Sequence, residues 1–105
     1  MNKIIVLDAR ASKEIKKFPK QVRSKVKAYL NILAETGRLS KPFAKKLTGK
    51  QNLYEIRIKY NGAWRILYAY FEETKIIVLS GFHKKTQKIP QNEILKAQKR
   101  MQEYI

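Results

Sequence analysis

The first half of the chain combines one strand-like run with two helix-like runs. Residues 3–8 read KIIVLD, and such consecutive β-branched residues favour a largely covered strand. Ser12 is predicted to cap a short helix that begins at Lys13. Pro19 suits the start of a second helix, whose apolar residues recur every three or four positions until Gly37 ends it. That apolar stripe comprises Val22, Val26, Tyr29, Leu30 and Leu33.

A connector is predicted for residues 39–50, which read LSKPFAKKLTGK. Pro42 and Gly49 interrupt it, as is typical of loops. Phe43 and Leu47 are four positions apart, so we expect a short helical turn that attaches the connector to the core.

Residues 53–82 predict three strands in series. Apolar and polar positions alternate in LYEIRIKY (53–60), and Asn61–Gly62 is a strong hairpin signal. The chain returns in WRILYAYF (64–71), and KIIVLSGF (75–82) is apolar enough to lie inside a sheet. One face would carry Tyr54, Ile56, Ile58, Tyr60, Trp64, Ile66, Tyr68 and Tyr70, and the other Glu55, Arg57, Lys59, Arg65, Leu67, Ala69 and Phe71.

The tail, residues 91–105, predicts a helix that follows Pro90. The resulting order of strand, two helices, three strands and helix indicates one α+β domain that spans residues 1–105. We expect a small, mainly antiparallel sheet, made of the first strand and the three-stranded meander. The two N-terminal helices and the C-terminal helix would pack on one side of it, and the first strand would lie against the meander.

The charge of the chain directs attention to anionic partners. Lys and Arg number 24 against 8 Asp and Glu, which gives a net charge of +16 and favours nucleic acid. An anionic membrane surface or an acidic protein would fit the charge equally well. The absence of cysteine excludes disulfides and cysteine metal sites and suits a reducing cytoplasm. No apolar run is long enough to span a membrane, and no signal-peptide pattern is present.

The polar face of the meander is the candidate site. Neighbouring strands lie about 5 Å apart, so Arg57 and Arg65 near the hairpin can share one phosphate. Arginine forks can hold the charge that develops when an RNA 2′-hydroxyl attacks that phosphate without a metal. Histidine changes its charge near neutral pH, and a lysine beside other cations can serve as acid or base. The candidate catalytic residues are therefore Arg57, Arg65, His83, Lys84 and Lys85, and the candidate RNA-binding residues are Lys45, Lys46, Lys50, Lys59, Tyr60, Tyr68 and Lys88.

Each of these residues also has a structural interpretation. A buried arginine needs a partner, so Arg65 either faces a ligand or pairs with Glu55 or Glu72. A lone histidine after a strand is more often a surface residue than a catalyst. Lysines at a strand end can act by electrostatic steering alone, and aromatic residues in strands usually pack in a core. Packing in the core is the structural interpretation of Trp64, Tyr68 and Tyr70. A solvated helix face is that of Lys20, Arg23, Lys25 and Lys27. No cluster of metal ligands and no cofactor motif is apparent in the sequence.

The runs LYEIRIKYNGAWRILYAY (53–70) and IIVLSGFHKKTQKIPQNEILKAQKR (76–100) resemble the RelE/ParE superfamily of toxins from bacterial type II toxin–antitoxin systems. The similarity spans nearly the whole chain and is greatest to the phage-derived HigB-like toxins. It implies a metal-independent mRNA interferase that acts on the ribosome. It also implies a cognate antitoxin, typically a helix-turn-helix protein, through which the complex would bind operator DNA.

The resemblance transfers to particular residues. Arg65 matches the arginine after the hairpin that is tied to the scissile phosphate, and Arg57 falls at a basic position of the preceding strand. Glu55 replaces a lysine that some members have, and residues 83–85 occupy a basic loop after the last strand. Residues 89–90 stand where some members have a tyrosine. We therefore hypothesise that the histidine of the basic loop carries the proton.

Two other functions remain open at the level of sequence. A ParE-like toxin shares this fold and inhibits DNA gyrase by protein binding, although that activity does not need phosphate-clamping residues. A non-catalytic RNA-binding module would use the same basic surface, because binding and cleavage depend on many of the same side chains.

Overall fold

A computed structural model describes residues 2–47, 49 and 52–105 of the chain. The elements are β1 (Ile4–Leu7), α1 (Ala9–Lys16), α2 (Lys20–Thr36), β2 (Ala44–Lys46), β3 (Tyr54–Lys59), β4 (Ala63–Phe71), β5 (Lys75–Lys84) and α3 (Gln91–Gln102). The strands form one sheet in the order β1-β5-β4-β3-β2. β1 runs parallel to β5 and the other neighbours are antiparallel, which confirms the α+β class and the position of the first strand against the meander. Within the described residues, no helix has the length and apolar character needed to cross a membrane.

The connector contains a strand in place of the expected helical turn. β2 pairs antiparallel with β3, and Lys45 lies opposite Glu55. Phe43 precedes this strand in a turn, and Leu47 follows it and packs in the core. The four-residue spacing was misleading because pairing with β3 satisfies the backbone of this short segment better than an isolated helical turn would. Lys50, one of the candidate RNA-binding residues, lies outside the described residues.

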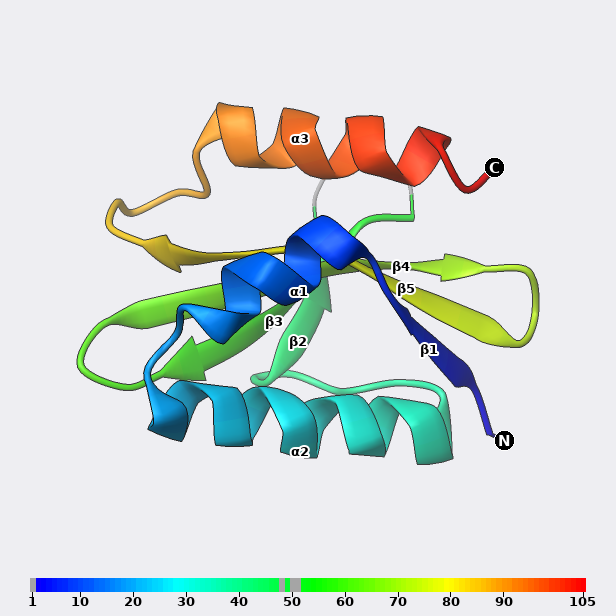
Figure 1. The fold of residues 1–105 in the computed structure, drawn as a ribbon, viewed down its shortest axis with the longest axis horizontal. Coiled ribbons are helices and arrows are strands. Elements are labelled where there is room, and N and C mark those ends of the chain that lie inside the picture. The colour runs from blue at the N-terminus through cyan, green and yellow to red at the C-terminus, as the bar shows by residue number, and fades with distance from the viewer. Residues whose placement is uncertain (1, 48, 50–51) are drawn as a thin grey trace.

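Helices cover both faces of the sheet, so the expectation that all three pack on one side is wrong (Figure 1). α1 and α2 contact one face through residues such as Val22 and Val26, which pack with Ile56 and Ile66. On the opposite face, α3 packs through Ala97 against the second apolar cluster, which comprises Leu47, Leu53, Leu67, Ala69, Ile77, Leu79 and Phe82. Since the inner strands are apolar on both faces over most of their length, the sheet needs a cover on each side.

The first helix begins earlier than the sequence predicts. Asp8, rather than Ser12, is the N-cap, and its side chain accepts hydrogen bonds from the backbone N–H groups of Arg10 and Ala11. Tyr104 donates to the same carboxylate at 2.7 Å, so the cap also joins α1 to the C-terminal segment. α2 follows Pro19 and ends at Gly37 with a φ of 85°, as expected.

Candidate functional site

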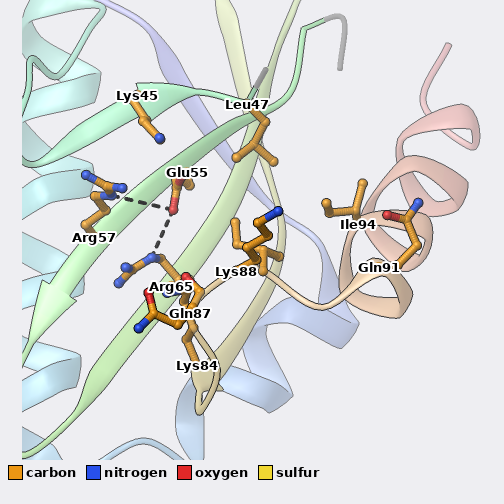
Figure 2. A pocket seen from close by; sticks show the side chains of 11 residues that line it. Lys45, Leu47, Glu55, Arg57, Arg65, Lys84, Gln87, Lys88, Gln91 and Ile94 are labelled. Atoms are coloured by element: carbon orange, nitrogen blue, oxygen red, sulfur yellow. Dashed lines mark hydrogen bonds and ion pairs between the residues drawn. The ribbon is translucent and has the colours of Figure 1, made fainter. Parts of the chain in front are cut away.

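Two arginines and one glutamate meet on the exposed part of the α3-facing side of the sheet. Arg57 in β3 and Arg65 in β4 are direct cross-strand partners, so their side chains share one face. The Oε1 atom of Glu55 lies 3.8 Å from Nε of Arg57 and 2.9 Å from Nε of Arg65, and Figure 2 shows it between the two guanidinium groups. These three residues are named the arginine cluster below.

The arginine cluster has one positive charge more than its single carboxylate neutralises. Glu55 is 3% exposed and Arg65 is 8% exposed, whereas the side chain of Arg57 retains 39% of its exposure. Burial lowers the pKa of Arg65, while attraction to Glu55 and repulsion from Arg57 act in opposite directions; the guanidinium stays protonated at any physiological pH. The Nε atoms of both arginines are buried without an aligned hydrogen bond among the described residues, despite their proximity to Glu55. The cluster therefore keeps an uncompensated positive charge, and Arg57 is its most exposed cation.

A cavity of about 500 Å³ opens in front of the arginine cluster. Its basic side is formed by Lys45, Lys84 and Lys88 (Figure 2), together with the two arginines. Leu47, Ile89 and Ile94 give it an apolar side next to α3, and Gln87 and Gln91 add polar groups. The cavity thus combines cations with apolar surface, which suits a nucleotide better than an inorganic ion.

Lys84 enters this cavity from the end of β5. It is the cross-strand partner of Ala63, which places it on the same face as Arg65, and its Nζ donates to the backbone oxygen of Gln87 at 2.6 Å. Burial lowers the pKa of Lys84, and repulsion from Arg65 and Arg57 contributes in the same direction. A lysine with a lowered pKa gives up its proton more readily, so Lys84 is the cavity residue best suited to proton transfer.

His83 lies on the other face of the sheet, which contradicts the hypothesis that it carries a proton at this site. It is the cross-strand partner of Trp64, and the two rings stack with centroids 4.1 Å apart and an interplanar angle of 12°. The cause is a bulge: Leu67 pairs with Ser80 but Tyr68 pairs with Val78, so the register shifts by one residue. Without that shift His83 would lie opposite Ala63 and would share the face of Arg65, because a slip of one residue exchanges the faces of a strand.

The other candidate residues divide between the cavity and its surroundings. Lys45 and Lys88 line the cavity, and Lys59 lies at a neighbouring one. Lys46 lines a hollow on the edge near Tyr54, and Lys85 is exposed outside the cavity. The first two belong with the arginine cluster and the last two do not.

The two candidate tyrosines do not reach the arginine cluster. Tyr68 is 1% exposed in the core beneath α1 and α2, and a side chain so covered has no face on which a base could stack. Tyr60 is partly buried against the same core, and its backbone oxygen accepts a hydrogen bond from Trp64 Nε1.

The sequence interpretation missed two residues that line the cavity, Gln87 and Gln91. Nothing in the sequence distinguishes them from ordinary surface glutamines. Among the described residues, no three His, Asp or Glu side chains gather as they would around a metal ion.

The three-layered fold is shared with solved toxin structures. An arginine double mutant of E. coli toxin RelE in the free state superposes with a TM-score of 0.75 at 26% identity, over 96% of this chain and 99% of that one. RelE in the intact E. coli RelBE toxin–antitoxin complex gives a TM-score of 0.66 at 27% identity, over 80% and 99% of the two chains. The RelB–RelE complex from Methanococcus jannaschii matches in fold, with a TM-score of 0.65 at 23% identity over 76% and 91%. The fold is therefore that of the RelE superfamily.

The family is given by a profile that matches residues 13–102, described as phage derived protein Gp49-like (DUF891). The chain belongs to this phage-derived Gp49-like family, and the predicted membership of the RelE superfamily is confirmed. No curated protein sequence matches the chain.

Proposed function

We propose that this protein is the toxin of a type II toxin–antitoxin system and that it is a metal-independent endoribonuclease. Its substrate is messenger RNA, cleaved on the ribosome, so that its action inhibits translation in the cytoplasm. The observation that supports this proposal is the arginine cluster, in which two guanidinium groups share one carboxylate at the wall of a cavity. The RelE toxins of similar fold supply the precedent for a toxin.

The proposed reaction is an internal transesterification. The 2′-hydroxyl of the RNA gives its proton to solvent water as its oxygen attacks the neighbouring phosphorus. The bond from phosphorus to the 5′-oxygen breaks, and a 2′,3′-cyclic phosphate and a 5′-hydroxyl result. Negative charge develops on the non-bridging oxygens, where Arg57 and Arg65 donate hydrogen bonds. Glu55 keeps the two guanidinium groups oriented toward a common point.

Lys84 supplies the proton for the leaving oxygen in this proposal. Its ammonium group lies on the same face as Arg65 and lines the same cavity. Because burial lowers its pKa, it is a stronger acid than an ordinary lysine. It can protonate the 5′-oxygen as the bond to phosphorus breaks, and this avoids an unstable alkoxide product.

The partners follow from charge and fold. A net charge of +16 steers the protein toward the phosphate-rich surface of the ribosome. RelE is held in a complex with RelB in the E. coli and M. jannaschii structures, and we infer that this protein has a cognate antitoxin of its own. That antitoxin would be a helix-turn-helix protein, and operator DNA would be bound only through the complex.

The test compares the purified protein with Arg57→Ala on ribosomes that carry a defined message, with and without EDTA. Arg57 is chosen because its side chain is partly exposed, whereas loss of Arg65 would leave the buried Glu55 without its closest cation. New 3′ ends should appear with and without EDTA for the parent. They should form about 10²–10³-fold more slowly for Arg57→Ala, the usual effect of removing one charge-stabilising donor.

Lys99→Ala is the matched control, since it also removes one positive charge but lies exposed on α3 outside the cavity. It should cleave at the rate of the parent. Absence of new 3′ ends for the parent, in both conditions, would overturn the ribonuclease assignment. In that case inhibition of gyrase supercoiling would identify a ParE-like inhibitor, and retained RNA binding without toxicity would identify a non-catalytic module.

A further inference from the structure

A second cavity adjoins the arginine cluster. It has a volume of about 540 Å³ and shares Arg57 and Arg65 with the first cavity. Lys25 of α2 and Lys59 of β3 add two further cations to its wall. An anion bound by the two arginines would therefore border two basic cavities.

Phe43 is the exposed aromatic residue in this second cavity. It is 46% exposed, and the other large hydrophobic residues of the described chain with comparable exposure are aliphatic: Ile4, Leu7, Ile32, Leu95 and Ile105. A phenylalanine exposed to this extent gains little from the folded core. Its exposure beside four cations therefore calls for an explanation other than packing.

The ring of Phe43 is positioned by one aromatic contact and by two backbone hydrogen bonds of the same residue. Tyr29 of α2 packs against it with centroids 5.6 Å apart and an interplanar angle of 38°. The backbone oxygen of Phe43 accepts a hydrogen bond from the N–H of Arg57 at 2.7 Å, and its own N–H donates to the oxygen of Ser40 at 3.0 Å. The position of the ring is thus coupled directly to the strand that carries one of the two arginines.

These features match the requirements of single-stranded RNA. A splayed nucleotide presents a phosphate to cations and a base to an aromatic face, and such base stacking is independent of sequence. An acidic protein partner could also pair with Lys25 and Lys59, and loss of antitoxin affinity is therefore one outcome of the test below.

We propose that Phe43 is the stacking platform for a nucleobase next to the scissile phosphate, so that the RNA strand passes from the second cavity across Arg57 and Arg65 into the first. Lys25 and Lys59 contact the phosphate that follows in the second cavity. This inference rests on the proposed function and adds to it a base-binding subsite. Because a phenyl ring forms no hydrogen bonds, the subsite favours an unpaired, stackable base and does not select among the four bases.

The experiment measures binding without cleavage. The probe is a single-stranded oligoadenylate with 2′-fluoro sugars, which lack the attacking hydroxyl, and with 2-aminopurine in place of one adenine. Stacking on an aromatic ring quenches the fluorescence of 2-aminopurine. The parent should bind and quench the probe, whereas Phe43→Ala should bind about 5- to 100-fold more weakly, the range expected for loss of one stacked base, and should lose the quenching.

Two matched variants and a second probe separate stacking from general damage. Phe43→Trp should keep both the affinity and the quenching. Leu95→Ala should behave as the parent, because Leu95 is also a large exposed hydrophobic residue but lies on α3. An oligonucleotide with abasic positions in place of the bases should bind the parent and Phe43→Ala equally, since no base remains to stack.

The results distinguish failure of this inference from failure of the ribonuclease assignment. If the parent cleaves ribosome-bound message but Phe43→Ala binds and quenches the probe like the parent, Phe43 is not a base platform. A Phe43→Ala protein that loses affinity for its antitoxin while it retains the probe would assign the surface to a protein partner, which also overturns the proposal. A parent that binds and quenches but never cleaves contradicts the proposed function alone.

Discussion

Two groups of charged side chains in this molecule both combine carboxylates with cations, but they differ in how far their charges are balanced. The arginine cluster of Glu55, Arg57 and Arg65 lies on β3 and β4 and opens into a cavity. The second group, named the buttress here, consists of Glu14 on α1 and of Glu93, Lys96 and Arg100 on α3, so that two carboxylates balance two cations. It joins α1 to α3 across the edge of β5. Each group contains a largely covered carboxylate in contact with arginine, yet only one has charge left for a ligand.

Glu14 and Arg100 of the buttress satisfy most of each other's hydrogen-bonding groups. Arg100 donates to both carboxylate oxygens of Glu14, at 3.1 and 2.9 Å, and to the backbone oxygen of Leu79 at 2.8 Å. The N–H of Gly81 donates to Glu14 as well, at 3.1 Å. Burial would raise the pKa of Glu14, but the hydrogen bonds from Arg100 and Gly81 outweigh it and hold that pKa below its ordinary value.

The charges and hydrogen bonds of the arginine cluster are not balanced in this way. Its one carboxylate faces two guanidinium groups, and neither Nε atom has an aligned acceptor among the described residues. The comparison shows that a buried ion pair does not by itself mark a site. An excess of cation and an adjoining cavity distinguish the candidate site from the buttress.

The largest expected effect is a loss of stability when the arginine of the buttress is removed. Arg100→Ala leaves Glu14 half-buried without its bidentate partner and removes the donor to Leu79, so it should reduce the free energy of unfolding by about 3–5 kcal/mol. Urea unfolding followed by circular dichroism measures this change. The rate of RNA cleavage per folded molecule should stay that of the parent.

The neighbouring Lys99→Ala serves as the control, since Lys99 is exposed and its replacement should leave stability within about 0.5 kcal/mol of the parent. Equal stability of Arg100→Ala and Lys99→Ala would contradict the structural role of the buttress. A loss of cleavage by correctly folded Arg100→Ala would show that the buttress also serves the site.

The next effect tests proton transfer from Lys84. Lys84→Arg keeps the positive charge but replaces the acid with a guanidinium that does not release its proton, so cleavage should fall about 100-fold. In the parent the lowered pKa of Lys84 places its loss of a proton below the ordinary lysine value of about 10.4, and cleavage should decline as the pH rises through it. The pH profile of single-turnover cleavage should lose this alkaline decline in Lys84→Arg.

Lys85→Arg provides the matched comparison, because Lys85 is the next residue, is exposed and does not line the cavity. It should retain both the rate and the alkaline decline of the parent. An alkaline decline that persists unchanged in Lys84→Arg would assign the titrating group to another residue.

A third prediction concerns the carboxylate that caps α1. A hydrogen bond from Arg10 lowers the pKa of Asp8 and outweighs the burial that opposes it, while Tyr104 contributes in the same direction as Arg10. The folded pKa lies below the unfolded value of about 3.9, so the ionised form stabilises the protein above that pH and this contribution is lost as the pH falls further. Asp8→Asn retains a capping side chain but not the charge, and at pH 7 it should reduce stability by roughly 1.5–3 kcal/mol.

Thermal unfolding of Asp8→Asn and the parent between pH 7 and pH 2 checks this prediction. The difference in unfolding free energy between the parent and Asp8→Asn should be largest near neutral pH and should decrease below about pH 4. Glu103→Gln alters the exposed carboxylate that Arg10 also contacts and should change the curve much less. A difference that stays constant down to pH 2 would mean that the charge of Asp8 is not the source of its contribution.

Much of this fold is predictable because apolar and polar residues alternate along β3 and β4 with the two-residue period of a strand. The alternation in β3 and β4 placed Arg57 and Arg65 on one face and Ile56 and Ile66 on the other, and the structure has both pairs there. The pairing of Arg65 with Glu55, one of the alternatives open at the level of sequence, is also observed. The assignment of faces depends on local periodicity, and the ion pair depends in addition on the register of β3 and β4.

The errors arise where tertiary context decides. β2 has only three residues, too few for its period to be read, and its strand state comes from pairing with β3. The cover on the second face was overlooked because Leu67 and Ala69, which flank Tyr68 and face α3, were assigned to an exposed surface. The bulge in β5 has no signature in the sequence, yet it decides whether His83 or Lys84 faces the arginines.

The smallest expected effect therefore tests that register shift. His83 stacks on Trp64 on the face opposite the arginine cluster, so His83→Ala should reduce stability by about 0.5–1.5 kcal/mol and leave the rate and pH profile of cleavage unchanged. His83→Phe should restore most of the stability, because a phenyl ring can stack on Trp64 but cannot carry a proton. If both variants fold and both cleave far more slowly than the parent, His83 takes part in the chemistry. The strand would then have to adopt the unshifted register on RNA, and the assignment of Lys84 would be wrong.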